Sequence, residues 1–96
     1  MLKDLFIRPD FDGAAIHVEF TPPAGCTKTD YEVVDGRQTM ASGTATDKPA
    51  RFDVSLPNFK PWSVENPHLY LLKLRIHHEG QVLEHHQPFG MTKIHI

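Results

Sequence analysis

The histidines are the residues of this chain whose number and spacing most invite a chemical role. There are seven, and four of them fall in the stretch HHEGQVLEHH, residues 77–86. Imidazoles that face one another across a hairpin could share a zinc or copper ion. A two-residue turn at Glu79–Gly80 would give these cross-strand pairs: His77 with Val82, His78 with Gln81, Leu74 with His85 and Lys73 with His86. At about 3.3 Å per residue, His77 and His86 then lie roughly 13 Å apart along the hairpin, too far to share one ion, so this register favours ordinary surface histidines. A bulge that shifted the register would instead favour a metal site.

The carboxylates could supply general acid or base chemistry if two of them were paired around a substrate. Those of Asp10, Asp12, Asp35 and Glu79 lie instead in turns, where carboxylates serve as turn formers and solvated charge. The sequence has no glycine-rich phosphate loop and no visible Ser/His/Asp constellation. Cys26 is the single cysteine, so it can form no internal disulfide and is expected to be structural. We therefore expect no catalytic residue, bound metal or cofactor in this chain.

The elements that must position these side chains follow a period of two. The stretch AAIHVEF places Ile16, Val18 and Phe20 on one face of a strand, and RFDVSL and YLLKLRI repeat the pattern. Turn signals occur at Asp12–Gly13, Asp35–Gly36 and Glu79–Gly80. Strands are expected near 3–9, 14–21, 29–35, 38–43, 50–56, 68–77 and 81–87, with a short segment near 92–96 that extends the last. The pattern predicts an all-β fold, an immunoglobulin-like β-sandwich of about seven antiparallel strands that forms one domain over residues 1–96.

Composition limits what such a domain can do. The chain has 96 residues, of which 40% are hydrophobic and 23% charged, as in one globular domain with one core. The net charge of −2 provides no basic field for nucleic acid. No apolar run of about 18 residues is present, so no segment is expected to span a membrane. We recognise no signal peptide, and the compartment stays open.

The stretch PWSVENPHLYLLKLRI, residues 61–76, joins the single tryptophan to the strongest strand pattern. Tyr70 lies where immunoglobulin-like sandwiches carry a tyrosine corner, whose hydroxyl bonds to backbone upstream. Leu72 occupies the position of a disulfide cysteine in antibody domains, so we expect it in an aliphatic centre that touches both sheets. Trp62 is expected to plug one end of the core, and the alternative is a sugar-stacking platform.

Two motifs in the second half of the chain are specific enough to compare with a known family. The first is WSVENPHLY, with the matching residues Trp62, Ser63, Glu65, Asn66, Pro67, Leu69 and Tyr70. The second is PFGMTKIHI, with the matching residues Phe89, Gly90, Ile94 and Ile96. They resemble Leu-Trp-Ser-Pro-Glu-Asn-Pro-x-Leu-Tyr and Phe-Gly-Phe-Arg-x-Ile-x-Ile in the immunoglobulin-like domain of glycoside hydrolase family 2, which includes β-galactosidases, β-glucuronidases and β-mannosidases. The chain departs from these motifs at Pro61, Val64, Met91 and Thr92, the last in place of a usual arginine.

The resemblance implies a function that the residues of this chain do not supply by themselves. Members of the family hydrolyse terminal β-linked sugars, and retaining hydrolysis needs two carboxylates roughly 5 Å apart, which the family carries on a separate barrel. The chain would then be a non-catalytic structural domain whose partners are a preceding jelly-roll domain and the following catalytic barrel. The alternative is a free-standing carbohydrate-binding or adhesion-type module. A sugar binder needs exposed aromatics in a row, for which Tyr31, Phe59 and Trp62 are the candidates.

The end of the chain, PFGMTKIHI, holds more apolar groups than a small sandwich is expected to bury. Gly90 is interpreted as the point at which the last strand bends or bulges. Phe89 and Met91 are expected to contribute to a partly exposed apolar patch, which would dock on the barrel in a longer protein. In the isolated chain, this patch and a free edge strand would support weak self-association.

Overall fold

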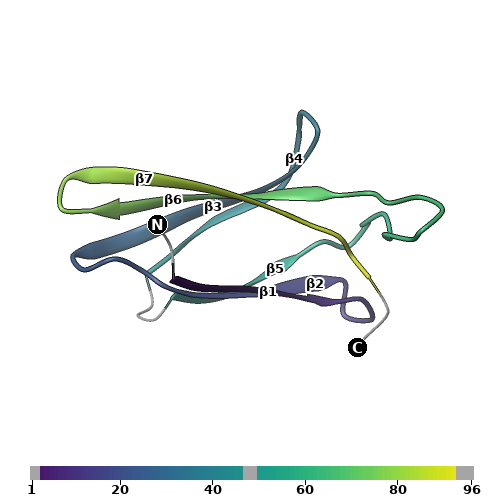
Figure 1. The fold of residues 1–96 in the computed structure, drawn as a ribbon, viewed down its shortest axis with the longest axis horizontal. Coiled ribbons are helices and arrows are strands. Elements are labelled where there is room, and N and C mark those ends of the chain that lie inside the picture. The colour runs from purple at the N-terminus through teal and green to yellow at the C-terminus, as the bar shows by residue number, and fades with distance from the viewer. Residues whose placement is uncertain (1–2, 47–49, 93–96) are drawn as a thin grey trace.

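The computed structural model describes residues 3–46 and 50–92, which form two stacked layers of β-strand (Figure 1). The strands are β1 (Lys3–Asp10), β2 (Ala15–Thr21), β3 (Cys26–Asp35), β4 (Gln38–Ala45), β5 (Ala50–Ser55), β6 (Tyr70–His78) and β7 (Gln81–Phe89). Neighbouring strands pair antiparallel throughout. The described residues contain no helix long and apolar enough to cross a membrane. The predicted all-β fold of seven strands is confirmed.

The strands divide into two sheets, in the orders β1-β2-β5 and β4-β3-β6-β7. The chain crosses from one layer to the other after β2, after β4 and after β5. This is the two-layer arrangement of an immunoglobulin-like sandwich, in which each sheet buries one face against the other. β1 begins toward one end of the long axis, whereas the segment after β7 leaves toward the other end (Figure 1).

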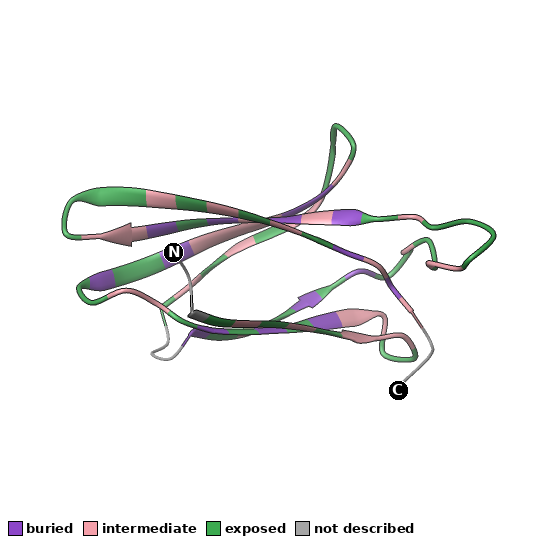
Figure 2. Cartoon of the chain, viewed as in Figure 1, coloured by how far each residue is buried: buried purple, intermediate pink, exposed green. Residues whose placement is uncertain are grey.

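Alternate residues of the strands fill the space between the sheets (Figure 2). On β2 the expected inward residues Ile16, Val18 and Phe20 are buried, and every second residue of β6 from Tyr70 to Ile76 is buried as well. Burying one such aliphatic or aromatic side chain contributes about 1.5–3 kcal/mol, so the phase of each strand is strongly determined. The predicted phase of β2 and β6 is confirmed.

Element boundaries differ from the sequence-based ones by a few residues. β3 begins at Cys26 rather than near residue 29, β6 begins at Tyr70 rather than near 68, and β7 continues to Phe89. In the β3–β4 hairpin Asp35 pairs with Gln38, so the turn consists of Gly36 and the residue after it, not of Asp35 and Gly36. The strand segment expected near 92–96 falls almost entirely on residues 93–96, which lie outside the described part of the chain.

Candidate functional site

The loop between β5 and β6, residues 56–69, lies beside the segment through which the chain leaves β7 (Figure 1). Pro61 forms a parallel bridge with Met91, and the main-chain N–H of Trp62 donates to the carbonyl oxygen of Met91 at 2.9 Å. The two sequence motifs are therefore in direct contact. We call the contact of Pro61 and Trp62 with Gly90 and Met91 the exit junction.

Gly90 is required by the close approach of the Trp62 ring. A Cβ atom at position 90 would lie 2.9 Å from Cγ and Cδ1 of Trp62, well inside the normal contact distance of carbon atoms. The β6–β7 register runs to Phe89 without a bulge, and the φ angle of Gly90 is not positive. The structure thus gives Gly90 a steric reason in place of the bend or bulge that the sequence suggested.

Tyr70 ties the loop to the core through its hydroxyl group. Its side chain is 1% exposed, and the hydroxyl oxygen accepts a hydrogen bond from the main-chain N–H of Lys60 at 2.6 Å. Its ring stacks on Phe89 with centroids 5.7 Å apart, and His68 packs edge-on at 5.0 Å. This is the geometry of a tyrosine corner, which satisfies a partly buried main-chain donor. Leu72, two residues further along, is 0% exposed within a core that draws on both sheets.

The residue types of the WSVENP motif fold it into a fixed turn. Ser63 and Asn66 exchange main-chain hydrogen bonds of 3.1 and 3.2 Å, and the Ser63 hydroxyl also accepts the Asn66 N–H at 3.0 Å. Short polar side chains close such turns, and Pro67 restricts φ directly after it. His68 Nε2 lies 3.1 Å from Oδ1 of Asp35, which links the loop to the end of β3. The loop is therefore anchored at several points.

The expectation that Phe89 and Met91 are partly exposed is wrong. Phe89 is 7% exposed and Met91 is 0% exposed. Phe89 lies opposite Tyr70 at the end of the β6–β7 ladder and faces the core. Met91 belongs to the same core, and the loop pairs with it through the bridge from Pro61. The expectation failed because it did not foresee that the loop would cover the exit strand.

Two other apolar side chains are exposed on the loop that forms the exit junction. Val64 is 80% exposed and Leu69 is 54% exposed, and both belong to the loop of residues 56–69. Sequence reasoning did not single them out as surface residues. The alternation of inward and outward positions holds along a strand and gives no orientation for residues of a loop.

The aromatic residues that a sugar-binding surface would need are engaged within the fold. Tyr31 stacks on Phe52 with ring centroids 4.3 Å apart. Phe59 packs edge-on against Phe11 of the β1–β2 turn, with ring centroids 5.1 Å apart. Trp62 is half-buried at the exit junction. Among the described residues the exposed aromatic is Phe6, at 59%. One ring does not make a row, so no observation favours the carbohydrate-binding alternative.

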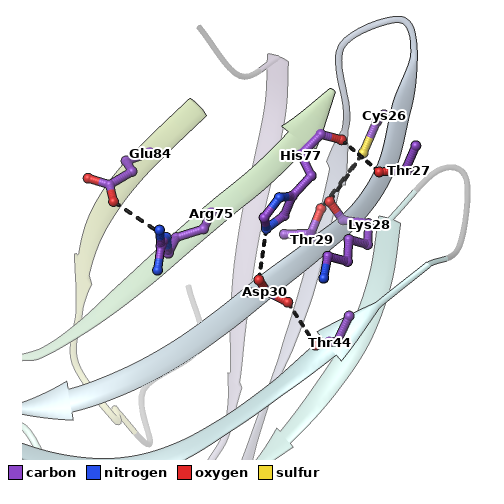
Figure 3. Close-up of polar contacts among 9 residues, drawn as sticks. All are labelled: Cys26, Thr27, Lys28, Thr29, Asp30, Thr44, Arg75, His77 and Glu84. Atoms are coloured by element: carbon purple, nitrogen blue, oxygen red, sulfur yellow. Dashed lines mark hydrogen bonds and ion pairs between the residues drawn. The ribbon is translucent and has the colours of Figure 1, made fainter. Parts of the chain in front are cut away.

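The outer face of the β4-β3-β6-β7 sheet carries alternating charges around a hollow of about 550 Å³. Figure 3 shows Asp30 between His77 and Thr44, and Arg75 directed toward Glu84. The Thr44 hydroxyl donates to Asp30 at 2.8 Å, and His77 Nε2 lies 2.8 Å from the other Asp30 oxygen. Arg75 Nε lies 3.5 Å from Glu84 Oε1. Acids and bases therefore compensate one another across neighbouring strands.

The protonation behaviour of Asp30 does not suit glycoside hydrolysis. A general acid for that reaction needs a carboxyl group whose pKa is raised. The pKa of Asp30 is lowered instead, first by the hydrogen bond from Thr44 and then by the bond from His77. Asp10 accepts the main-chain N–H of Gly13 at 2.9 Å and so acts as a turn former. Both carboxylates have structural roles.

The predicted register of the histidine-rich hairpin is confirmed. The pairs are His77 with Val82, His78 with Gln81, Leu74 with His85 and Lys73 with His86. Glu79 and Gly80 have φ values of 49° and 74°, the positive values that a tight two-residue turn uses. Within residues 3–46 and 50–92, no three His, Cys, Asp or Glu side chains come together in a way that could hold a metal ion.

We expect His17, on the outer face of the other sheet, to make stability depend on pH. Its Nδ1 lies 2.5 Å from Asp53 Oδ1, and its Nε2 lies 3.7 Å from Asp10 Oδ2. The hydrogen bond to Asp53 raises the pKa of His17 above 6.5, and the charges of Asp53 and Asp10 act in the same direction. A raised folded-state pKa gives stabilisation that is fully present below the unfolded value and is lost as the pH rises through the folded value.

Urea unfolding of the wild type and of His17→Gln between about pH 5 and pH 8.5 measures this effect. The free energy of unfolding of the wild type should exceed that of His17→Gln most at the acidic end of this range, and the two should be equal at the alkaline end. His86→Gln, which changes an exposed histidine of the other sheet, is the matched control. An advantage of the wild type that grew with pH would contradict the assignment.

The fold and the exit junction define the class of protein, an immunoglobulin-like β-sandwich domain. Residues 1–91 match the sequence family Glycosyl hydrolases family 2. The match covers nearly the whole chain, and the chain belongs to this family. No curated protein sequence matches the chain significantly.

Solved structures with the same fold come from much longer chains. The β-glucuronidase from Ruminococcus gnavus is similar with a TM-score of 0.71 at 19% identity, and the match covers 94% of this chain and 15% of that chain. The FMN-binding β-glucuronidase from Faecalibacterium prausnitzii L2-6 is similar with a TM-score of 0.65 at 17% identity, over 90% of this chain and 14% of that chain. Such a likeness establishes the fold, and function has to be argued from the site.

Proposed function

We propose that this chain is the non-catalytic immunoglobulin-like domain of a family 2-type glycoside hydrolase, and that it links a jelly-roll domain to the catalytic barrel. The longer enzyme would hydrolyse terminal β-glycosides such as β-galactosides or β-glucuronides. The observation that carries this proposal is the exit junction, in which Trp62, Gly90 and Met91 set the path of the chain beyond β7. A fixed exit path gives the next domain a defined orientation.

The shape of the domain supports a linking role. The longest dimension is 44 Å, and the described chain starts and ends toward opposite ends of that axis (Figure 1). A rigid body of this kind holds a preceding domain and a following domain apart. Val64 and Leu69, exposed on the loop that forms the exit junction, offer the following domain an apolar contact. This surface takes the place of the patch that the sequence assigned to Phe89 and Met91.

The protein encoded by the complete reading frame provides the test. We expect the frame to encode a barrel with two catalytic carboxylates after residue 96 and a jelly-roll domain before residue 1. In that protein, the double variant Val64→Glu, Leu69→Glu should uncouple this domain from the barrel. Thermal unfolding should then separate into distinct transitions, because domains that lose their interface unfold independently.

Two controls separate docking from folding. The same double variant should leave the Tm of the 96-residue chain nearly unchanged, because both side chains are already exposed there. Val82→Glu, at a 45% exposed position next to the β6–β7 turn, should leave the unfolding of the longer protein unchanged. A frame without a barrel would reject the proposed function. A frame with a barrel whose unfolding ignores the double variant would reject the docking surface alone.

A further inference from the structure

Each sheet ends in two edge strands, and β7 is the edge with the most regular geometry. β1 has a register shift and a positive φ of 57° at Asp4, and Pro9 lacks a main-chain N–H. β5 has six residues and contacts β4, the edge strand of the facing sheet. β4 pairs with β3 through a register shift, whereas β7 has nine residues, pairs with β6 without any shift and carries its proline only at the second-last position. A long, uninterrupted edge is a template for another strand.

The β6–β7 turn determines which main-chain groups of β7 are free. The two residues that flank a two-residue turn form main-chain hydrogen bonds with each other. Along each strand, the next residue and every second residue after it direct their N–H and C=O groups away from the partner strand. Because His78 pairs with Gln81, the outward-directed residues are Val82, Glu84, His86 and Pro88, the last of which has a free C=O but no N–H. All four are exposed on the outer face of the sheet.

We propose that β7 is a self-association edge, on which β7 of a second copy of this chain pairs antiparallel, with Glu84 opposite His86 of that copy. Two neighbouring registers are also sterically possible. One would set the two Glu84 carboxylates directly opposite each other, and the other would set the two His86 imidazoles opposite each other. Like charges directly across a ladder are unfavourable and opposite charges are favourable. The proposed register forms the acid–imidazole pair twice, because a two-fold interface repeats every contact.

The charges around β7 favour the same register. Glu84 lies 3.5 Å from Arg75, and its side chain is 59% exposed, so the carboxylate stays accessible to a neighbour. His86 lies opposite Lys73 in the β6–β7 ladder, so a Glu84 carboxylate from a second copy would lie beside both an imidazole and a lysine ammonium group. One added strand buries far less than the roughly 1,200 Å² of a stable interface, so the association is expected to be weak. The inference depends on β7 alone and is independent of the proposed function.

Sedimentation equilibrium and amide NMR shifts of the 96-residue chain, from micromolar to millimolar concentration, test the proposal. We expect a dimer whose concentration-dependent shifts centre on residues 82–88. Glu84→Lys and His86→Glu should each raise the Kd about tenfold, because the first removes both carboxylate–imidazole pairs and the second sets two carboxylates opposite each other twice. The variant with both changes restores opposite charges in this register alone, and its Kd should return to within about threefold of the wild type.

Glu19→Lys is the matched control, since Glu19 pairs with Arg51 at 2.9 Å on the outer face of the other sheet. It should leave the Kd unchanged. Glu84→Pro removes an outward N–H without breaking the bonds to β6, so it blocks the edge by a second route. Thermal unfolding confirms that each variant is folded. A chain that stays monomeric at millimolar concentration, shifts centred on another edge, or a combined variant that fails to restore the dimer would overturn the proposal.

Discussion

Leu72→Ala should lower the free energy of unfolding by about 2–5 kcal/mol, the range for removing a large aliphatic side chain from a packed core. Leu72 is 0% exposed and lies in the first half of β6, where it pairs with Val33 of β3 on one side and with Gln87 of β7 on the other. The vacated volume is enclosed by both sheets, so the neighbouring side chains cannot collapse freely into it. Stabilities of small domains are about 5–15 kcal/mol, and this one change would remove a large share.

Leu71→Ala is the matched control for that experiment. Leu71 is the neighbouring residue of the same type on the same strand, but it points to the other face and is only partly buried. Its truncation should therefore cost clearly less than truncation of Leu72. Urea denaturation of both variants gives the comparison. A loss below about 1 kcal/mol for Leu72→Ala, or equal losses for the two, would place Leu72 outside the core.

Gly90→Ala should lower the free energy of unfolding by about 1–3 kcal/mol, the usual cost of forcing an extra carbon into a packed contact. The new methyl group would lie 2.9 Å from the Trp62 ring. To relieve the clash, the ring must move, and the main-chain bond from Trp62 to Met91 would be disturbed with it. Denaturant unfolding measures the cost, and Trp62 fluorescence reports the movement of the ring.

A double-mutant cycle distinguishes this contact from backbone strain. In a Trp62→Ala background the ring is absent, so Gly90→Ala should cost much less than in the wild type. The coupling between two residues in direct contact is expected at about 0.5–3 kcal/mol. Equal costs in both backgrounds would show that the requirement for glycine comes from the backbone and not from Trp62.

The strands and their pairing could be predicted because both depend on local sequence. An alternating strand has only two possible phases, and the apolar residues of β6 select one of them. The Glu79–Gly80 turn then determines the β6–β7 register, because a two-residue turn leaves no choice of partner for His78. The histidine-rich hairpin could therefore be placed residue by residue from the sequence.

The exit junction could not be predicted because its contacts join residues far apart in the chain. Gly90 is explained by Trp62, and the burial of Met91 by the loop at Pro61. No periodicity relates these positions, so the sequence suggested a bend at Gly90 and an exposed Met91. The same limit applies to Val64 and Leu69, whose exposure depends on how the loop packs on the sandwich.

The central proposal is that this chain is a structural domain without glycosidase chemistry of its own. The most direct test is turnover of chromogenic β-galactoside, β-glucuronide and β-mannoside substrates by the purified 96-residue chain, with its fold verified by circular dichroism. We predict no turnover above the buffer blank after stringent purification. Turnover that persists through purification, and that is lost in a folded Asp30→Asn variant, would contradict the claim.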